Sequence, residues 1–416
     1  MDKSVPRGRL QGIVAPPCSK SYAQRALAVS LLAKGESTLA NMDFCNDTLS
    51  AIRCIETLGA KVARPDDHTV VVRGGLNPVS QSLYVGESGL SARLFTPIAS
   101  LCNRPMTIIG EGTLLYRPMD MMIAPLRALG VEVRDGGGHL PIEVTGPMSG
   151  GEIDVDGSVS SQFVTGLLLA LPLAENDTVI NVAGAVSKPY LDMTIDIAEH
   201  FGVAIEHNDY EQFYIAGYQS YTPTKYSIEG DWSAAAMLLV AGAVAGEVTV
   251  SNISMLSKQA DVAICDALVR AGAELTSEGE TITAAHRPLQ AFEFDATNCP
   301  DLFPALATLA AAAEGESTII GTRRLEHKES NRAEAIAKEF GKLGIEVDIS
   351  TENIMKIRGG KITGGVEVES YGDHRMAMTL AVAALLSDQG LTIRGAECVA
   401  KSYPEFFEDL ERLRYE

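Results

Sequence analysis

The feature that most constrains this chain is a regular spacing of threonines along its 416 residues. Successive gaps are 69, 71, 71, 69 and 74 residues, for Thr38, Thr107, Thr178, Thr249, Thr318 and Thr392. Such a period indicates copies of one supersecondary unit, here six. Six further residues each lie 17 to 19 positions before one of these threonines, at or beside the start of an apolar stretch: Lys20, Gly89, Ser160, Asp231, Asp301 and Asp373. Polar side chains therefore recur at one corner of the repeated unit.

Each copy combines two predicted helices with several predicted strands. An apolar stretch of three or four turns, such as residues 162–173, indicates a buried helix, and a β-rich run around the threonine indicates a strand. An amphipathic helix follows and ends at a glycine, the residue most common just past a helix C-terminus. These glycines recur every 70 to 72 residues: Gly59, Gly130, Gly202, Gly272 and Gly344.

The two ends of the chain do not form complete copies. The last copy stops at Leu413, inside its second helix, whereas residues 9–14 read as a strand that precedes the first copy. We expect this N-terminal arm to supply the strands that the last copy lacks. The prediction is therefore two domains of three copies each, residues 19–228 and residues 1–18 together with 229–416, with a ligand cleft between them.

Composition limits the partners that such a chain can have. A net charge of −20 argues against nucleic acid and anionic membranes. Seven scattered cysteines and an N-terminus without an apolar signal region are typical of a cytoplasmic protein, and the apolar runs are too short to cross a bilayer. Neither zinc-ligand spacing nor a nucleotide-binding glycine motif occurs, so no metal or organic cofactor is expected.

The starts of the first helices are predicted to bind anions. If three copies pack around a pseudo-threefold axis, these helices run parallel and their N-termini converge, each with about half a positive charge and free N–H groups. Five cations also recur in the loops before the second helices: Arg117, Lys188, Lys258, Lys328 and Lys401. A ligand with several negative charges is therefore expected, such as one with two phosphates and one or two carboxylates.

Several polar motifs have a structural explanation as well as a functional one. Residues 16–25 could be a capped helix with solvated cations, and residues 158–163 a serine-rich cap. Residues 327–332 place Glu329 between cations, which could be a surface salt-bridge network. Residues 373–375 could be a helix cap with charges in solvent. Taken singly, none of these motifs decides between packing and function.

Taken together and in this order, the motifs resemble those of the enolpyruvyl transferases, and within that family the members that use shikimate 3-phosphate. They span the chain: Lys20-Ser21 with Arg25, Gly89 with Arg93, Arg117-Pro118, Ser160-Ser161-Gln162, Ser187-Lys188-Pro189-Tyr190, Pro300-Asp301, Lys328-Glu329 with Arg332, Asp373-His374-Arg375, and Lys401. The resemblance implies a two-domain, inside-out α/β barrel with six βαβαββ repeats, three per domain. Parallel helices would be buried, with the sheets outside.

The resemblance also implies a reaction and a set of site residues. The enolpyruvyl group of phosphoenolpyruvate would pass to the 5-hydroxyl of shikimate 3-phosphate through a tetrahedral intermediate, in a cytoplasmic, monomeric enzyme of chorismate and aromatic amino-acid biosynthesis. Implied contacts of shikimate 3-phosphate are Lys20, Ser21, Arg25, Ser160, Ser161, Gln162, Ser187, Tyr190, Asp301 and Lys328. Those of phosphoenolpyruvate are Lys20, Gly89, Arg93, Arg117, Gln162, Arg332, Asp373, Arg375 and Lys401. For catalysis, Asp301 would be the base and Glu329 the acid, and Lys20 could also transfer protons.

The chain departs from the usual family pattern at several positions. Glu87-Ser88-Gly89-Leu90 replaces Asn-Ala-Gly-Thr and places a carboxylate beside the expected phosphoenolpyruvate site. Cys18 replaces a glycine, and Arg324 stands where many members have an asparagine that contacts shikimate. These departures bear on affinity and inhibitor response more than on the reaction.

Two other functions stay open from the sequence. A UDP-N-acetylglucosamine enolpyruvyl transferase would share the fold, but that family has Lys-Asn where this chain has Lys20-Ser21, and often a cysteine where residues 110–116 have none. A non-enzymatic acidic sliding clamp would place its cations on helices that line a DNA channel. Here the cations cluster with carboxylates at loops and helix starts, so the clamp is the more distant alternative.

Overall fold

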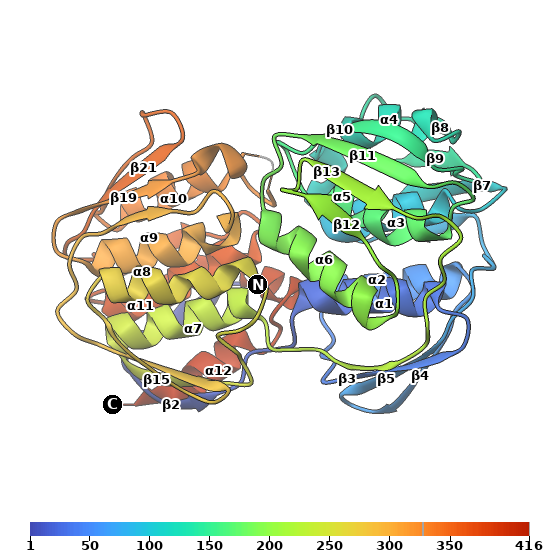
Figure 1. The fold of residues 1–416 in the computed structure, drawn as a ribbon. Helices are drawn as coiled ribbons and strands as arrows, with labels where there is room; N and C mark the ends of the chain where they lie inside the picture. The colour runs from blue at the N-terminus through green and yellow to red at the C-terminus, as the bar shows by residue number, and fades with distance from the viewer. Residues whose placement is uncertain (327, 416) are drawn as a thin grey trace. The chain divides into compact units, whose positions relative to one another are not determined.

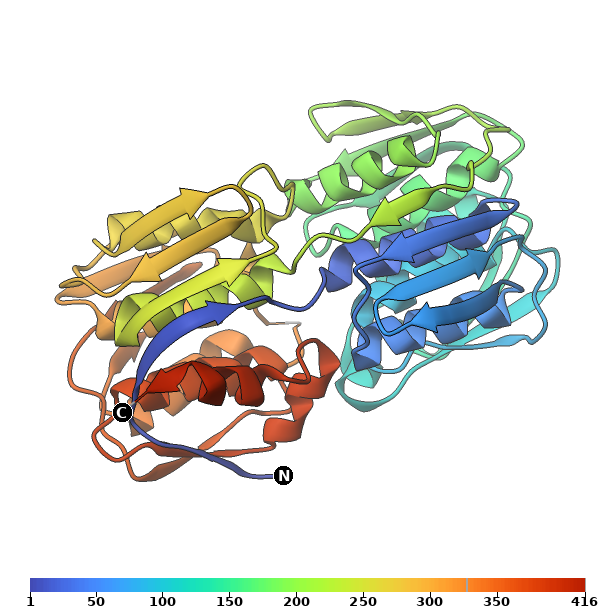
Figure 2. The same ribbon diagram turned by 90° about the horizontal axis from the view of Figure 1, so that it is seen from below.

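A computed structural model describes residues 1–326 and 328–415; His327, part of one motif above, and Glu416 lie outside the described residues. The chain splits into two compact units (Figures 1 and 2). The first-half unit is Cys18–Ile228, and the second-half unit is Met1–Pro17 with Glu229–Glu416. The chain therefore passes from one unit to the other twice, after Pro17 and after Ile228. No described helix is long and apolar enough to span a membrane.

Three copies of the repeated unit build the first-half unit. The first helix of each copy is α1 (Lys20–Leu32), α3 (Gly89–Ala99) and α5 (Gln162–Ala170). The second helix of each copy is α2 (Asn46–Thr57), α4 (Ile123–Ala128) and α6 (Lys188–His200). Every residue of α3 is buried, as are Phe163–Ala170 of α5, which fits their nearly continuous apolar sequence. The first helices thus form the interior.

Three four-stranded sheets cover these helices. Their strand orders are β14 (Lys225–Ser227), β3 (Glu36–Ala40), β5 (Thr69–Arg73), β4 (Lys61–Asp66); β6 (Ser82–Tyr84), β7 (Pro105–Ile109), β9 (Ile142–Thr145), β8 (Glu132–Asp135); and β10 (Gly151–Asp156), β11 (Thr178–Ala183), β13 (Gln212–Ile215), β12 (Glu206–Asn208). In each sheet the first pair is parallel and the others antiparallel. Buried and less buried side chains alternate along the central strands, as expected for sheets with one face on a core.

The second-half unit repeats this plan. Its first helices α7 (Trp232–Ala245), α9 (Phe303–Ala312) and α11 (His374–Leu386) all contact one another, and its second helices are α8 (Ile264–Arg270), α10 (Arg332–Lys342) and α12 (Phe406–Leu413). Its sheets run β16 (Glu274–Glu278), β17 (Thr281–Ala285), β15 (Gly246–Ser251), β2 (Arg9–Val14), β24 (Arg414–Tyr415); β18 (Glu293–Asp295), β19 (Glu316–Ile320), β21 (Ile354–Arg358), β20 (Glu346–Asp348); and β1 (Lys3–Val5), β23 (Leu391–Arg394), β22 (Val366–Glu369). The fold is thus the α/β architecture of six repeats that the sequence predicts.

The periodic residues occupy equivalent places in the copies. Each of the six threonines lies on an inner strand of its sheet, with neighbours on both sides: β3, β7, β11, β15, β19 and β23. The five periodic glycines all have a left-handed backbone, with φ between 80° and 112°. A side chain is strained in that conformation, which explains why the helix stop is glycine in each of the first five copies. Both sequence predictions are confirmed.

The expected role of the N-terminal arm is only partly right. Strand β1 does pair with β23 and completes the sheet of the last copy. Residues 9–14, however, form β2, which lies parallel to β15 of the fourth copy and also pairs with β24. The strand that directly precedes the fourth copy, β14, pairs instead with β3 of the first copy. The first and fourth copies thus exchange the strand that precedes each of them in the chain, and both strands pair within their own unit.

Candidate functional site

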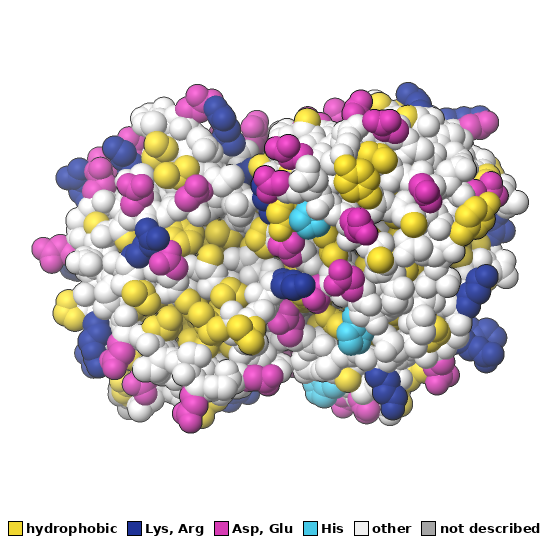
Figure 3. Space-filling model, in the orientation of Figure 1, with side chains coloured by type: hydrophobic (Ala, Val, Ile, Leu, Met, Phe, Trp, Pro, Cys, Tyr) yellow, Lys and Arg dark blue, Asp and Glu magenta, His cyan; other side chains and the backbone are white. Residues whose placement is uncertain are grey.

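The two units each carry part of the predicted site. The first-half unit holds Lys20, Ser21, Arg25, Gly89, Arg93, Arg117, Ser160, Ser161, Gln162, Ser187 and Tyr190, and the second-half unit holds Asp301, Lys328, Glu329, Arg332, Asp373, Arg375 and Lys401. Figure 3 shows acidic and basic side chains scattered over one face of the protein. Because acidic residues outnumber basic ones by 54 to 34, any anion site depends on local concentrations of positive charge.

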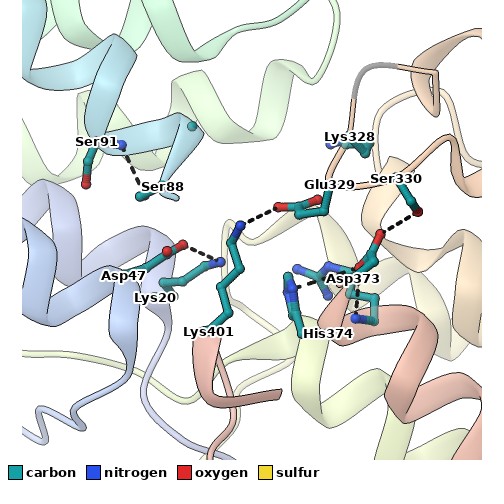
Figure 4. A network of polar contacts seen from close by, with 12 residues as sticks. Lys20, Asp47, Ser88, Ser91, Lys328, Glu329, Ser330, Asp373, His374 and Lys401 are labelled. Carbon is teal, nitrogen blue, oxygen red and sulfur yellow. Dashed lines mark hydrogen bonds and ion pairs between the residues drawn. The ribbon is translucent and has the colours of Figure 1, made fainter. Parts of the chain in front are cut away.

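Arg332, at the start of α10, organises the cluster of the second-half unit. Its side chain is 1 % exposed and makes ion pairs with three carboxylates. Nε donates to Asp373 Oδ2 at 2.8 Å, Nη1 to Asp301 Oδ1 at 2.8 Å, and Nη2 to Glu329 Oε2 at 2.7 Å. These carboxylates come from three separate segments, so one guanidinium fixes three parts of the chain. Glu329 and Asp373 are seen in Figure 4.

Asp301 is surrounded by cations. Besides Arg332, it accepts hydrogen bonds from Lys328 Nζ at 3.2 Å and Arg375 Nη2 at 3.2 Å. Burial alone would raise the pKa of Asp301, but the neighbouring Arg375, Lys328 and Arg332 hold the pKa of this carboxyl well below its ordinary value. Asp301 is therefore ionised at neutral pH. An ionised carboxylate can accept a proton.

The start of α11 adds further charge to this cluster. Asp373 caps the helix by accepting a hydrogen bond from the Arg375 amide at 3.0 Å, and Ser330 Oγ donates to Asp373 Oδ2 at 3.1 Å. Lys401 is buried at the end of the short segment Ala396–Lys401, with Nζ 3.8 Å from Glu329 Oε1 (Figure 4). Four cations thus meet three carboxylates within one unit.

Asp261 is a buried acid that the sequence analysis does not single out. Ser233 Oγ donates to its Oδ2, whereas Oδ1 is buried without a hydrogen-bond partner among the described residues. Burial, and then the charge of Asp301, raise the pKa of Asp261 to about 7. In the sequence, only the position of Asp261 could have pointed to it. Asp261 follows the periodic Lys258 by one helical turn, as Arg332 follows Lys328.

Replacing Asp261 with asparagine should make the protein more stable at alkaline pH. The pKa of Asp261 in the folded protein lies above the ordinary value of 3.8. Ionised Asp261 therefore lowers the free energy of unfolding, an effect that is absent below about pH 4 and complete above pH 7. The free energies of unfolding of the variant and the wild type, measured with urea, should be closer at pH 5 than at pH 8. At pH 8 the variant should be more stable by roughly 2–4 kcal/mol. Asp266→Asn, an exposed control on α8, should change little. An equal difference at both pH values would contradict this prediction.

Arg25, on α1, is a buried cation in the first-half unit. It is 1 % exposed, and its hydrogen bonds go to Thr194 Oγ1 at 2.9 Å, Tyr190 O at 3.1 Å, Ser21 O at 2.9 Å and Thr165 Oγ1 at 3.2 Å. All of these acceptors are neutral, and among the described residues no carboxylate forms an ion pair with Arg25. Burial lowers the pKa of Arg25 to about 10. A buried cation without a protein counterion is well suited to bind an anionic ligand.

Two more arginines lie at the start of α3. Arg93 Nη1 donates to Gln162 Oε1 at 2.9 Å, and its Nη2 donates to Pro118 O at 2.9 Å. The guanidinium of Arg117 lies against Gly89, where an added Cβ would be 2.5 Å from Nη1. Glycine at position 89 therefore leaves the space that the Arg117 side chain occupies. These contacts bring together four residues that the sequence predicts for one ligand.

The remaining predicted residues of the first-half unit lie at helix starts. Lys20 begins α1 and makes an ion pair with Asp47 at 2.9 Å (Figure 4). Ser160 Oγ accepts the Gln162 amide at 3.2 Å, and the buried Ser187 is the N-cap residue of α6. Asp47 is not among the predicted site residues, although an acidic residue in the first turn of a helix, here α2, is a recognisable signal.

Two of the five periodic cations are more exposed than the other three. Lys188 is 36 % exposed, with Nζ 3.8 Å from Asp209 and above the ring of Tyr210, and the Lys258 side chain is also exposed. Arg117, Lys328 and Lys401 are mostly or fully buried. The regular spacing thus reflects the repeated backbone, and only three of the five positions carry an inward cation. Among residues 1–326 and 328–415, no group of His, Cys, Asp or Glu could hold a metal ion.

The fold and the buried charge clusters define a transferase of the class represented by the EPSP synthase of Acinetobacter baumannii. That solved structure matches 99 % of this chain and 98 % of its own, with a TM-score of 0.85 and 27 % identity. The chain belongs to the EPSP synthase (3-phosphoshikimate 1-carboxyvinyltransferase) family, whose profile matches residues 5–410.

Curated relatives support the same family. The 3-phosphoshikimate 1-carboxyvinyltransferase of Clostridium perfringens is 36 % identical over 97 % of this chain and 96 % of its own. The enzyme of that name from Thermococcus kodakarensis is 40 % identical over 98 % of each chain. The family expected from the motifs is thus confirmed, and neither the UDP-N-acetylglucosamine alternative nor a sliding clamp is favoured.

Proposed function

We propose that this chain transfers the enolpyruvyl group of phosphoenolpyruvate to the 5-hydroxyl of shikimate 3-phosphate. The observation that carries the proposal is Arg25, a buried cation whose hydrogen bonds all go to neutral acceptors. The cluster of four cations and three carboxylates around Arg332 supports it. Each substrate has a phosphate and a carboxylate. These groups would supply the negative charge that the protein itself does not provide.

The residue assignments implied by the resemblance are kept as proposals. Asp301 takes the proton of the 5-hydroxyl while the oxygen of this hydroxyl bonds to C2 of phosphoenolpyruvate. Glu329 or Lys20 gives a proton to C3. In the second step C3 loses a proton, the C2–C3 double bond forms again and the C2–O bond to phosphate breaks. The cations around Asp301 stabilise the negative charge on the phosphate.

The low pKa of Asp301 needs an explanation if this group is a base. The cations that lower it, Arg375, Lys328 and Arg332, are the ones assigned to substrate anions. When a phosphate or carboxylate engages these cations, their influence on Asp301 falls and its pKa rises. Substrate binding would therefore strengthen the base at the moment when it is needed.

A phosphate-release assay tests the proposal directly. The protein is incubated with phosphoenolpyruvate and either shikimate 3-phosphate or UDP-N-acetylglucosamine, and inorganic phosphate is measured. Release with shikimate 3-phosphate alone is the expected result. Release with the nucleotide sugar alone, or with neither acceptor, would contradict the proposal.

Gly89→Ala should weaken the use of phosphoenolpyruvate. The new methyl group would overlap the Arg117 guanidinium and displace it. Because Arg117 is assigned to phosphoenolpyruvate, KM for this substrate should rise about tenfold, equivalent to about 1.4 kcal/mol. Gly341→Ala, in α10, is the matched control because nothing lies within 4 Å of its added Cβ. An unchanged KM in Gly89→Ala would remove Arg117 from this role.

We also propose that the two units act as the two domains expected from the sequence, and that the enzyme works as a cytoplasmic monomer without a cofactor. The proposal of two domains is supported by their separate sets of three sheets and by the separate packing of each set of helices. Gel filtration combined with light scattering would test the monomer. A mass near twice 44.3 kDa would contradict it.

A further inference from the structure

We propose that Glu339 is a positioning residue for the anion-binding start of α11. It holds the tight turn Ser370–Asp373, called here the 370–373 turn, which presents Asp373 and Arg375. Through this turn Glu339 would control the affinity for phosphoenolpyruvate. The inference rests on the proposed function, because it uses the assignment of Arg332 and Arg375 to that substrate.

The 370–373 turn has an unusual backbone. The Asp373 amide donates to Ser370 O at 2.9 Å, and the two central residues, Tyr371 and Gly372, have φ of 56° and 67°. Two left-handed central residues define a type I′ turn, in which asparagine and glycine are preferred. A tyrosine is unfavourable in this conformation, so contacts elsewhere must hold Tyr371 in place.

Glu339 supplies those contacts. It is 0 % exposed on α10, and its Oε1 accepts the Tyr371 hydroxyl at 2.5 Å. Its Oε2 accepts the Glu369 amide at 3.0 Å and the Lys342 ammonium at 2.6 Å. One buried carboxylate therefore binds the residue just before the turn and the first central residue within it. Three donors, one of them charged, satisfy this buried anion.

The same helix also reaches the residue at the end of the turn. Arg332 lies at the start of α10 and binds Asp373, and Glu339 lies two helical turns further along. Helix α10 therefore holds residues 369–373 at both ends. Asp373 in turn caps α11 through the Arg375 amide. If the turn shifted, Asp373 and Arg375 would move with it, and small misplacements of binding groups lower rates strongly.

The chain offers a closely matched control for this contact. Tyr210 also has a left-handed backbone, with φ of 63°, and its hydroxyl donates to Asp192 Oδ1 on α6 at 2.7 Å. Tyr210 lies in the turn between β12 and β13, and none of the residues assigned to substrate follows it on β13. Tyr210→Phe thus removes the same kind of hydrogen bond from the same kind of backbone in the first-half unit, which does not contain α11.

Steady-state kinetics of Tyr371→Phe, Glu339→Gln and Tyr210→Phe test the inference. In Tyr371→Phe and Glu339→Gln, KM for phosphoenolpyruvate should rise five- to twentyfold, while KM for shikimate 3-phosphate stays within twofold. Tyr210→Phe should leave both values unchanged. A lower melting temperature with unchanged KM, or an equal rise in both KM values, would show a merely structural role and overturn the proposal.

Hydrogen exchange separates this inference from the proposed function. The amides of Glu369 and Asp373 should exchange faster in Tyr371→Phe than in the wild type or in Tyr210→Phe, whatever reaction the protein catalyses. Unchanged exchange would overturn the proposal that Glu339 holds the 370–373 turn. If the wild type released no phosphate from the two substrates, the proposed function would fail, and faster exchange would still establish the contact.

Discussion

Arg332→Met should abolish measurable turnover and destabilise the protein by about 3–5 kcal/mol at neutral pH. The substitution leaves Asp301, Glu329 and Asp373 close together without the guanidinium that binds all three. Methionine fills a similar volume, so the loss of stability would result from the missing charge rather than from a cavity. Turnover should fall because the same three carboxylates would lose their orientation. Urea unfolding and kcat are the two measurements.

The pH dependence of this loss tests its cause. The pKa of Asp301 is depressed in the folded protein, so its stabilising contribution is present above the unfolded pKa and is lost as the pH falls. The difference between Arg332→Met and the wild type should therefore persist from pH 7 to about pH 4 and shrink at lower pH. Arg270→Met, which removes an exposed pair with Asp266, should change stability by less than about 1 kcal/mol. A difference independent of pH would point to packing instead.

Neutralising either proposed proton-transfer group should lower kcat by about 10²- to 10⁴-fold. Asp301→Asn and Glu329→Gln keep the shape of each side chain and remove its charge. Both residues lie in the cluster around Arg332, where Asp301 also contacts Lys328 and Arg375 and Glu329 contacts Lys401. The reaction must move one proton from the hydroxyl and one to C3. The loss of either proton-transfer group should therefore lower kcat.

Asp266→Asn is the control for these two variants, and circular dichroism would confirm that each protein is folded. A near-native kcat in Asp301→Asn would remove Asp301 as the base. A near-native kcat in Glu329→Gln would leave Lys20 as the proton donor to C3. Lys20 is held by Asp47, so Lys20→Met would then be the variant with the large loss.

The contacts of the buried charges were not visible in the sequence. Asp47, Asp261 and Glu339 are ordinary acidic residues in the sequence, yet each holds or faces a residue at a helix start or in the turn that precedes one. Which acid meets which base depends on how the copies pack, because residues far apart in the chain become neighbours. The same holds for Lys188 and Lys258, whose spacing suggested inward cations and whose side chains are exposed.

The sequence by itself determined the repeat, the helix stops and the central strands, because these depend on local backbone geometry. A left-handed glycine ends the second helix in each of the first five copies, and an alternating run forms a strand in every copy. Only the tertiary structure decided that β2 pairs with β15 and β14 with β3. A strand's own pattern does not specify its neighbour, since any strand with a matching inner face can form the same backbone hydrogen bonds.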